Sequence, residues 1–301
     1  FVFLDSEHNI WFADYRGVDK VTYHPFTNYF KSSGMLEDEV TAIVEFEPGN
    51  FIFGHNSGFT LYKDRIFTSV NFRQNERSSD IVARVLDLVV DDEGNIWAAA
   101  GFYGLIKISR DGSYTEVATV NGSVTALAYS KDFGLLVASS NGVFSFNNGK
   151  LEEFDPKTKL KNFRKIYIFN DKVYLTSQLG IFQLLDGKII PLVKDKNPLV
   201  SSTFSLFQEE DGSLLVGAET GLYSFKDGEL TKFVKNGFSI SRSVYFIIKS
   251  KQKNYWFGTI DGLTRWDGSS TIYNYSVDDG LSGYEMNRPA AVIDAENKLW
   301  I

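Results

Sequence analysis

The stretch VLDLVVDDEGNIWAAAGFYGLIKISRDGSYTEVATV, Val85–Val120, decides the fold. It contains four short runs of β-branched, aromatic and aliphatic residues, and turn-forming residues separate each run from the next. Asp92–Asn95 lies between the first and second runs, and Asp111-Gly112 lies between the third and fourth. Asx-Gly pairs favour tight hairpins because both central residues need positive φ. The stretch therefore predicts a meander of four antiparallel strands.

The same pattern recurs along the whole chain. The centre of the second strand is Trp97 in this unit, and an equivalent apolar residue occurs at intervals of 38 to 45 residues. A glycine followed by an apolar residue comes six or seven positions after each of the first seven anchors. The anchors are Trp11, Ile52, Trp97, Leu136, Tyr174, Leu215, Trp256 and Trp300, and the glycines are Gly17, Gly58, Gly104, Gly142, Gly180, Gly221 and Gly262.

These repeats predict an all-β fold, a β-propeller of four-stranded blades. No interval between turn signals shows the 3.6-residue periodicity of a helix over ten or more residues. A meander of about 40 residues cannot bury both of its faces alone, whereas radial stacking covers each face with the neighbouring blade. The tryptophans Trp11, Trp97 and Trp256 are then expected to pack between blades.

The repeats assign residues 1–301 to a single propeller domain. Because the chain starts and stops inside repeats, we expect it to be a piece of a longer protein. Two ring sizes remain open: eight blades with one incomplete, or seven blades with one closed by strands from both ends, and we favour seven. Seven full repeats lie at about 1–36, 40–80, 85–122, 124–162, 163–200, 203–241 and 244–283, and the first two strands of an eighth lie at 287–301.

Composition narrows the range of functions. The 31 Lys and Arg residues against 38 Asp and Glu give a net charge of −7, which argues against nucleic acid as a partner of this segment. The absence of cysteine excludes disulfides, thiolate metal sites and cysteine nucleophiles. No run of about 18 apolar residues occurs, so we expect membrane contact only through the rest of a longer protein.

Motifs for catalysis are absent from the sequence. The three histidines His8, His24 and His55 are not spaced as metal ligands, and no nucleophile elbow or phosphate-binding loop occurs. Adjacent acids such as Glu152-Glu153 point to opposite faces of a strand, so they do not form the carboxylate pair of a glycosidase. We therefore predict no catalytic residue, no metal site and no cofactor in this segment.

Four arginines precede innermost strands of the predicted blades: Arg84, Arg164, Arg242 and Arg288. In a closed ring they converge near one mouth of the central channel, where guanidinium groups suit carboxylates or sulfates and aromatic rings can stack on sugars. The alternative is that each arginine pairs with an acid such as Glu39 or Asp279. The candidate ligand-binding residues are Tyr15, Arg16, Arg84, Tyr103, Arg164, Arg242, Tyr284 and Arg288.

The strings DSEHNIWFADYRGVDKV, DDEGNIWAAAGFYGLIKI, DGSLLVGAETGLYSF and KNYWFGTIDGLTRWDG resemble the two-component regulator propeller repeat. The segment Asp278–Ile301 is similar to the last blade of the second propeller in such sensors. This resemblance implies the periplasmic input region of a histidine kinase, often a hybrid kinase, that responds to oligosaccharides. It implies as partners a small polar ligand, a neighbouring propeller or all-β domain of the same protein, and a second copy in a homodimer.

Three hypotheses follow for the function of this segment. The leading one is a ligand-sensing propeller that itself has no enzymatic activity and passes a two-state change to the membrane. The second is a scaffold whose flat faces hold a protein partner. The third is a polysaccharide-degrading enzyme.

Overall fold

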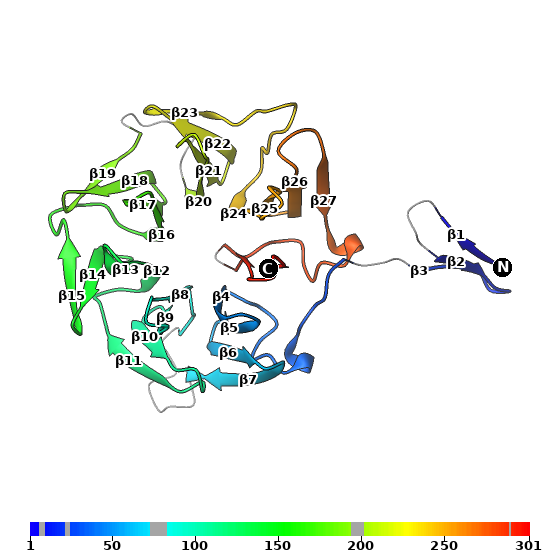
Figure 1. Cartoon of the computed structure of the whole chain (residues 1–301), viewed down its shortest axis with the longest axis horizontal. Helices are drawn as coiled ribbons and strands as arrows, with labels where there is room; N and C mark the ends of the chain where they lie inside the picture. The colour runs from blue at the N-terminus through cyan, green and yellow to red at the C-terminus, as the bar shows by residue number, and fades with distance from the viewer. Residues whose placement is uncertain (6–9, 22–24, 73–82, 194–201, 289) are drawn as a thin grey trace.

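The computed structural model describes residues 1–5, 10–21, 25–72, 83–193, 202–288 and 290–301. These residues form antiparallel strands, and the helical segments among them are short 3₁₀ turns such as η1 (Lys31–Ser33) and η4 (Val277–Asp279). Each blade is a meander in which consecutive strands pair, so the innermost strand comes first in the chain and the outermost comes last (Figure 1). The all-β propeller class predicted from the repeats is confirmed.

Six sheets have four strands and are numbered here as blades 1 to 6. Blade 1 contains β4 (Ala42–Glu47), β5 (Asn50–Gly54), β6 (Gly58–Lys63) and β7 (Ile66–Asn71); blade 2 contains β8 (Asp87–Val90), β9 (Ile96–Ala99), β10 (Leu105–Ile108) and β11 (Tyr114–Ala118); blade 3 contains β12 (Val124–Ser130), β13 (Gly134–Ser139), β14 (Val143–Asn147) and β15 (Lys150–Phe154). Blade 4 contains β16 (Phe163–Phe169), β17 (Lys172–Ser177), β18 (Gly180–Leu185) and β19 (Lys188–Pro191); blade 5 contains β20 (Thr203–Gln208), β21 (Leu214–Ala218), β22 (Gly221–Lys226) and β23 (Glu229–Lys232); blade 6 contains β24 (Val244–Lys249), β25 (Tyr255–Thr259), β26 (Gly262–Trp266) and β27 (Ile272–Tyr275).

A two-stranded sheet of β28 (Val292–Ile293) and β29 (Leu299–Trp300) completes the ring as blade 7. Seven hydrophobic clusters fill the spaces between neighbouring sheets, one for each pair of neighbours. Leu299 packs against the cluster of blade 6, and Trp300 packs against Phe51 and Phe53 of blade 1. The ring therefore has seven blade positions, which is the size favoured from the sequence, but the described strands of the first repeat do not help to close it.

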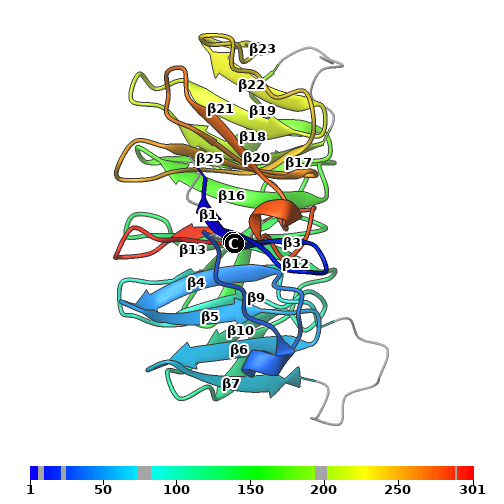
Figure 2. The same cartoon turned by 90° about the vertical axis from the view of Figure 1, so that its right-hand side faces the viewer.

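The first repeat differs from the full blade that the sequence predicts for residues 1–36. It has three described strands, β1 (Val2–Leu4), β2 (Ile10–Ala13) and β3 (Val18–Val21), which form a separate N-terminal sheet. This sheet lies beside the ring and not within it (Figure 1, Figure 2). Apolar side chains on it stay exposed, with Val2 at 70% and Leu4 at 57%.

Residues 25–36 close the ring instead of adding an outer strand to the first repeat. Phe26 packs edge-on against Tyr275 of blade 6, with ring centres 5.4 Å apart. Tyr29 stacks on Trp300 of blade 7 at 6.0 Å and contacts Phe67 of blade 1 at 5.5 Å. The segment therefore runs across the outer side of the two-stranded blade 7 and joins blade 6 to blade 1 (Figure 1).

The recurrent glycines and tryptophans have clear local roles. Gly262 adopts φ +112°, and a Cβ there would lie 2.3 Å from the carbonyl oxygen of Tyr275, so only glycine fits this turn. The indole of Trp97 donates a hydrogen bond of 2.8 Å to Asp91, which lies six residues earlier and also accepts from the backbone of the turn. The Trp300–Asp294 pair repeats this bond at 2.8 Å. The acid and the tryptophan thus fix the first turn of these blades.

Candidate functional site

The start of the innermost strand carries a β-bulge in four consecutive blades. In β12, β16, β20 and β24 the pairing with the second strand skips one residue. A bulge leaves one residue unpaired and re-aims its side chain, and bulges are frequent next to functional sites. The skipped residues are Thr125, Arg164, Phe204 and Tyr245.

Arg164 and Arg288 meet at the ring of Phe204. The guanidinium carbon of Arg164 lies 4.8 Å from the centre of this ring, and that of Arg288 lies 4.5 Å from it. Arg288 also lies 5.9 Å from the ring centre of Tyr245. Phe204 and Tyr245 are themselves buried. They therefore hold the two guanidinium groups in place by cation–π contact and leave the charged edges for other partners.

Neither of these two arginines forms an ion pair with a described residue. Nη1 of Arg164 is buried and has no hydrogen-bond partner in the described part of the chain. Burial and the positive charge of Arg288 lower the pKa of Arg164 to about 10, with an opposing effect from Glu219. Arg164 is still protonated at neutral pH. Arg164 lies where an innermost strand starts, and this end of the ring is called the mouth below. The mouth thus carries the two neighbouring positive charges of Arg164 and Arg288, with unused donor capacity.

The other two predicted arginines are paired. Nη2 of Arg84 lies 2.9 Å from Oε1 of Glu39, as the alternative interpretation expected. Nε of Arg242 lies 3.5 Å from Oδ2 of Asp261, which belongs to the same blade, and its guanidinium donates to Thr259 and Thr264. Arg84 and Arg242 therefore have less charge to offer a ligand than Arg164 and Arg288.

Asp279, which the sequence offered as another arginine partner, has a different role. Its carboxylate accepts a hydrogen bond of 2.8 Å from the backbone of Ser276. This contact belongs to the capping of the η4 turn. Asp279 therefore shapes the start of the connection between blades 6 and 7.

Residues 285–288 lie in the connection between blades 6 and 7 and contact blade 6 and the segment just before blade 1. The hydroxyl of Tyr245 donates to Glu285 at 2.9 Å, and the backbone of Met286 donates to Thr259 O at 3.2 Å. The amide of Asn287 donates to Val40 O, just before blade 1, at 2.6 Å. Tyr284 precedes this segment and is 63% exposed, which leaves its ring open to a ligand. The segment and the β28–β29 sheet that follows it lie toward the centre of the ring (Figure 1).

Three of the predicted residues do not join this group. Tyr15 and Arg16 lie in the β2–β3 turn of the N-terminal sheet, outside the ring, and contact each other at 5.1 Å. Tyr103 is only 6% exposed and stacks on Phe72 at 5.6 Å, so it cannot offer a free face to a sugar. The expectation that these three line the mouth is wrong. The reasons are the separate position of the first sheet and the packing of Tyr103 between blades 1 and 2.

Sequence reasoning missed Phe204 and Tyr245. Each follows the first residue of an innermost strand, at the same repeat position as Arg164. This shared position was a usable signal. The bulge that aims all three side chains toward one another is not visible in the residue types, because ordinary strand alternation assigns them to the face opposite their neighbours.

His55 is a buried structural residue and not a ligand of the mouth. It is fully buried, its Nδ1 lies 2.7 Å from Glu39 O, and its Nε2 lies 2.9 Å from Oγ1 of Thr60. Because a carbonyl oxygen only accepts, the proton is on Nδ1 and Nε2 accepts from the threonine hydroxyl. Asn56 in the same turn donates its side-chain amide to Glu37 and Glu39.

The burial of His55 predicts a pH dependence of stability. Burial lowers the pKa of His55 below its ordinary value of 6.5, and contacts with Glu39 and Glu37 offset this only in part. As the pH falls through 6.5, the unfolded chain takes up a proton that the folded chain resists. The free energy of unfolding should therefore fall by about 1 kcal/mol more between pH 7 and pH 5.5 in the wild type than in His55→Gln. Urea titrations at both pH values measure this difference. An equal fall in the free energy of unfolding in the wild type and in His55→Gln would contradict it.

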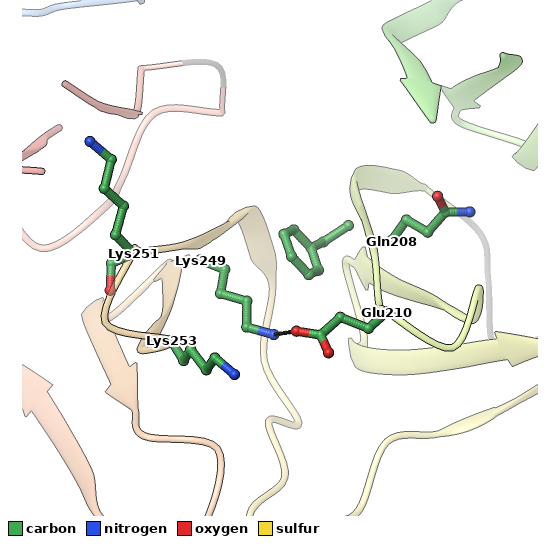
Figure 3. Close-up of a pocket in the computed structure, with 7 residues that line it drawn as sticks. Gln208, Glu210, Lys249, Lys251 and Lys253 are labelled. Atoms are coloured by element: carbon green, nitrogen blue, oxygen red, sulfur yellow. Dashed lines mark ion pairs between the residues drawn. The ribbon is translucent and has the colours of Figure 1, made fainter. Parts of the chain in front are cut away.

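A hollow of about 370 Å³ lies on another part of the ring, between the β20–β21 and β24–β25 turns (Figure 3). Lys249 in its wall lies 3.6 Å from Glu209 and 3.9 Å from Glu210. Lys251 donates to Ala295 O at 2.9 Å. Two of the three lysines that line the hollow are thus already paired within the protein. Its lining residues are Phe207, Gln208, Glu210, Lys249, Ser250, Lys251 and Lys253.

Among the residues that the structure describes, no group of three or more His, Asp or Glu side chains could hold a metal ion. None of their helices has the length and apolar character needed to cross a membrane.

Comparison with known proteins rests on structure. No family model and no curated protein matches the chain. The extracellular domain of the hybrid two-component system BT3049 from B. thetaiotaomicron superposes with a TM-score of 0.80 at 15% identity, over 99% of this chain and 43% of that one. The extracellular domain of the hybrid two-component system BT4673 from the same organism gives 0.67 at 14% identity, over 98% and 44%. Virginiamycin B lyase from Staphylococcus aureus gives 0.60 at 15% identity, over 79% and 84%.

The fold is therefore that of the propellers in extracellular domains of two-component systems. The resemblance of the repeats to two-component regulator propellers is confirmed at the level of fold. The chain spans less than half of the length of the BT3049 and BT4673 domains.

Proposed function

We propose that this propeller is a periplasmic ligand-sensing domain of a two-component signal transduction protein, and that it binds a small polar ligand such as an oligosaccharide. The observation that carries the proposal is the pair Arg164 and Arg288, held beside Phe204 at the mouth with no acid partner in the described residues. Its fold neighbours are extracellular domains of two-component systems, which supports a position outside the cytoplasm.

The mouth has the chemistry that such a ligand needs. Guanidinium groups donate several hydrogen bonds in a planar fork, which suits carboxylate, sulfate and hydroxyl oxygens. The exposed ring of Tyr284 precedes Arg288 by four residues and offers an apolar face to a sugar ring. Of the residues predicted from the sequence, Arg164, Tyr284 and Arg288 carry the proposal, whereas Arg84 and Arg242 are paired within the protein.

A scaffold function is the second candidate, because the N-terminal sheet exposes apolar side chains. Phe3 is 51% exposed and Val18 is 66% exposed. Exposed apolar surface of this kind is typical of contacts with other protein surfaces. A neighbouring propeller, an all-β domain of the same protein or a second copy would each cover it. This function is compatible with ligand sensing at the mouth.

The likeness to virginiamycin B lyase concerns the fold and gives the enzyme hypothesis no residue in this chain. The described histidine, His55, is fully buried with both ring nitrogens engaged, so it cannot exchange protons with a bound substrate. The proposal for this segment is binding without catalysis.

A thermal-shift screen tests the proposal. The 301-residue chain is heated with acidic and neutral oligosaccharides, and a ligand that binds the folded state should raise Tm by several degrees when it is present far above its Kd. Arg288→Ala should abolish the shift, whereas Tyr15→Ala, in the sheet outside the ring, should preserve it. Failure of every oligosaccharide to raise Tm, or a shift that survives Arg288→Ala, would contradict binding at this mouth.

A further inference from the structure

We infer that Arg164 and Arg288 jointly bind one oxyanion group of the ligand, a carboxylate or a sulfate. The bound anion then bridges residues 285–288 and blade 7 to blade 4. The inference rests on the proposed function and narrows its ligand class. It also assigns the structural change that binding produces.

The charge of the two arginines favours an anion. Arg164 and Arg288 contact the same ring, and neither has an acid partner in the described residues. The positive charge of Arg288 lowers the pKa of Arg164, so the two guanidinium groups repel each other and a negative charge beside both is favoured over a neutral group. Of the neighbouring acids, Glu285 accepts from Tyr245. Glu219 raises the pKa of Arg164 by its charge but forms no ion pair with it among the described residues.

Both guanidinium groups are held in place before a ligand binds. Nη1 of Arg164 is already buried without a hydrogen-bond partner, so its desolvation cost is present in the free protein. An anion that accepts from this guanidinium gains a charge-assisted hydrogen bond without paying that cost again. The cation–π contacts with Phe204 fix both side chains in advance.

The two arginines come from distant parts of the chain. Arg164 is the bulged residue of β16 in blade 4, whereas Arg288 lies four residues before β28 of blade 7. Blade 7 has only two described strands, and its contacts come from the 285–288 segment, the 25–36 segment and blades 1 and 6. Its two strands are only half-buried, and elements with few buried contacts open at low free energy. An anion that bridges Arg164 and Arg288 adds a direct link between this sheet and blade 4.

The experiment combines calorimetry with hydrogen exchange on the 301-residue chain at constant ionic strength. The probes are trigalacturonate for carboxylate, a sulfated disaccharide for sulfate and maltotriose as the neutral control. We expect an acidic probe to bind, and Arg164→Gln and Arg288→Gln each to weaken its binding by at least about tenfold. Arg84→Gln, at the ion-paired arginine, is the matched control and should change the affinity by less than about twofold.

Hydrogen exchange tests the bridge, because a purely local role of Arg164 would not change amide exchange in residues 285–301. The bound anion should slow amide exchange in residues 285–301, and Arg164→Gln should remove this slowing although it lies in another blade. Binding of maltotriose as tight as that of the acidic probes, with equal affinity in both glutamine variants, would overturn the inference and leave the proposed function standing. Anion binding without slowed exchange in residues 285–301 would overturn the part of the inference in which the anion bridges blade 7 to blade 4. Which acidic probe binds decides between carboxylate and sulfate, and either supports the site.

Discussion

Replacing Trp97 with alanine is expected to lower the free energy of unfolding by about 3 to 5 kcal/mol, whereas Trp11→Ala should leave the unfolding midpoint of the ring unchanged. The two residues occupy the same repeat position, and each indole donates a 2.8 Å hydrogen bond to an acid six residues earlier. They differ in what surrounds them. Trp97 is 7% exposed and packs between blades 2 and 3, with the ring of Phe146 at 5.4 Å.

Trp11 lies in the N-terminal sheet, outside the ring, and is only half-buried. Its loss removes no contact between blades, so the ring should keep its stability. Urea unfolding followed by far-UV circular dichroism measures both variants. Equal losses in the two would show that the N-terminal sheet unfolds with the ring, and a loss below about 1 kcal/mol in Trp97→Ala would contradict the packing argument.

The fold could be predicted from the sequence because each blade carries its own signals. Turn residues, strand residues and the Gly-apolar pair recur at a nearly constant period, and this local pattern needs no knowledge of distant contacts. The first repeat shares the pattern, yet it stands outside the ring. Residues 25–36 decide this, since Phe26 and Tyr29 pack on blades 6, 7 and 1 and close the ring there. The repeated sequence pattern does not specify such contacts between distant segments.

The candidate site could be predicted only in part for a related reason. The repeat position placed Arg84, Arg164, Arg242 and Arg288 ahead of innermost strands, and Arg164 and Arg288 do meet. An arginine is available to a ligand only if no acidic residue from another part of the chain pairs with it. Glu39 reaches Arg84 from 45 residues away. A single sequence does not specify pairings of this kind.

Lys165→Met is expected to destabilise the ring by about 3 kcal/mol, because it leaves a buried carboxylate without its cation. Asp87 in blade 2 is 2% exposed, and its Oδ1 lies 2.5 Å from Nζ of Lys165 in blade 4. Its Oδ2 accepts from the backbone of Leu127 in blade 3 at 2.9 Å. One carboxylate therefore joins the innermost strands of three blades. The side chain of Lys165 is 26% exposed, so water reaches the pair and the expected loss is at the lower end of the range for buried ion pairs.

The double variant Asp87→Asn, Lys165→Met separates the unpaired charge from the loss of packing. Asparagine keeps an oxygen that accepts from Leu127 but carries no charge, so the double variant should recover at least half of the stability that Lys165→Met loses. Urea unfolding of the wild type, both single variants and the double variant gives the coupling energy directly. No recovery in the double variant would mean that Lys165 acts through the packing of its aliphatic stem, and a loss below about 1 kcal/mol in Lys165→Met would mean that solvent already screens the carboxylate.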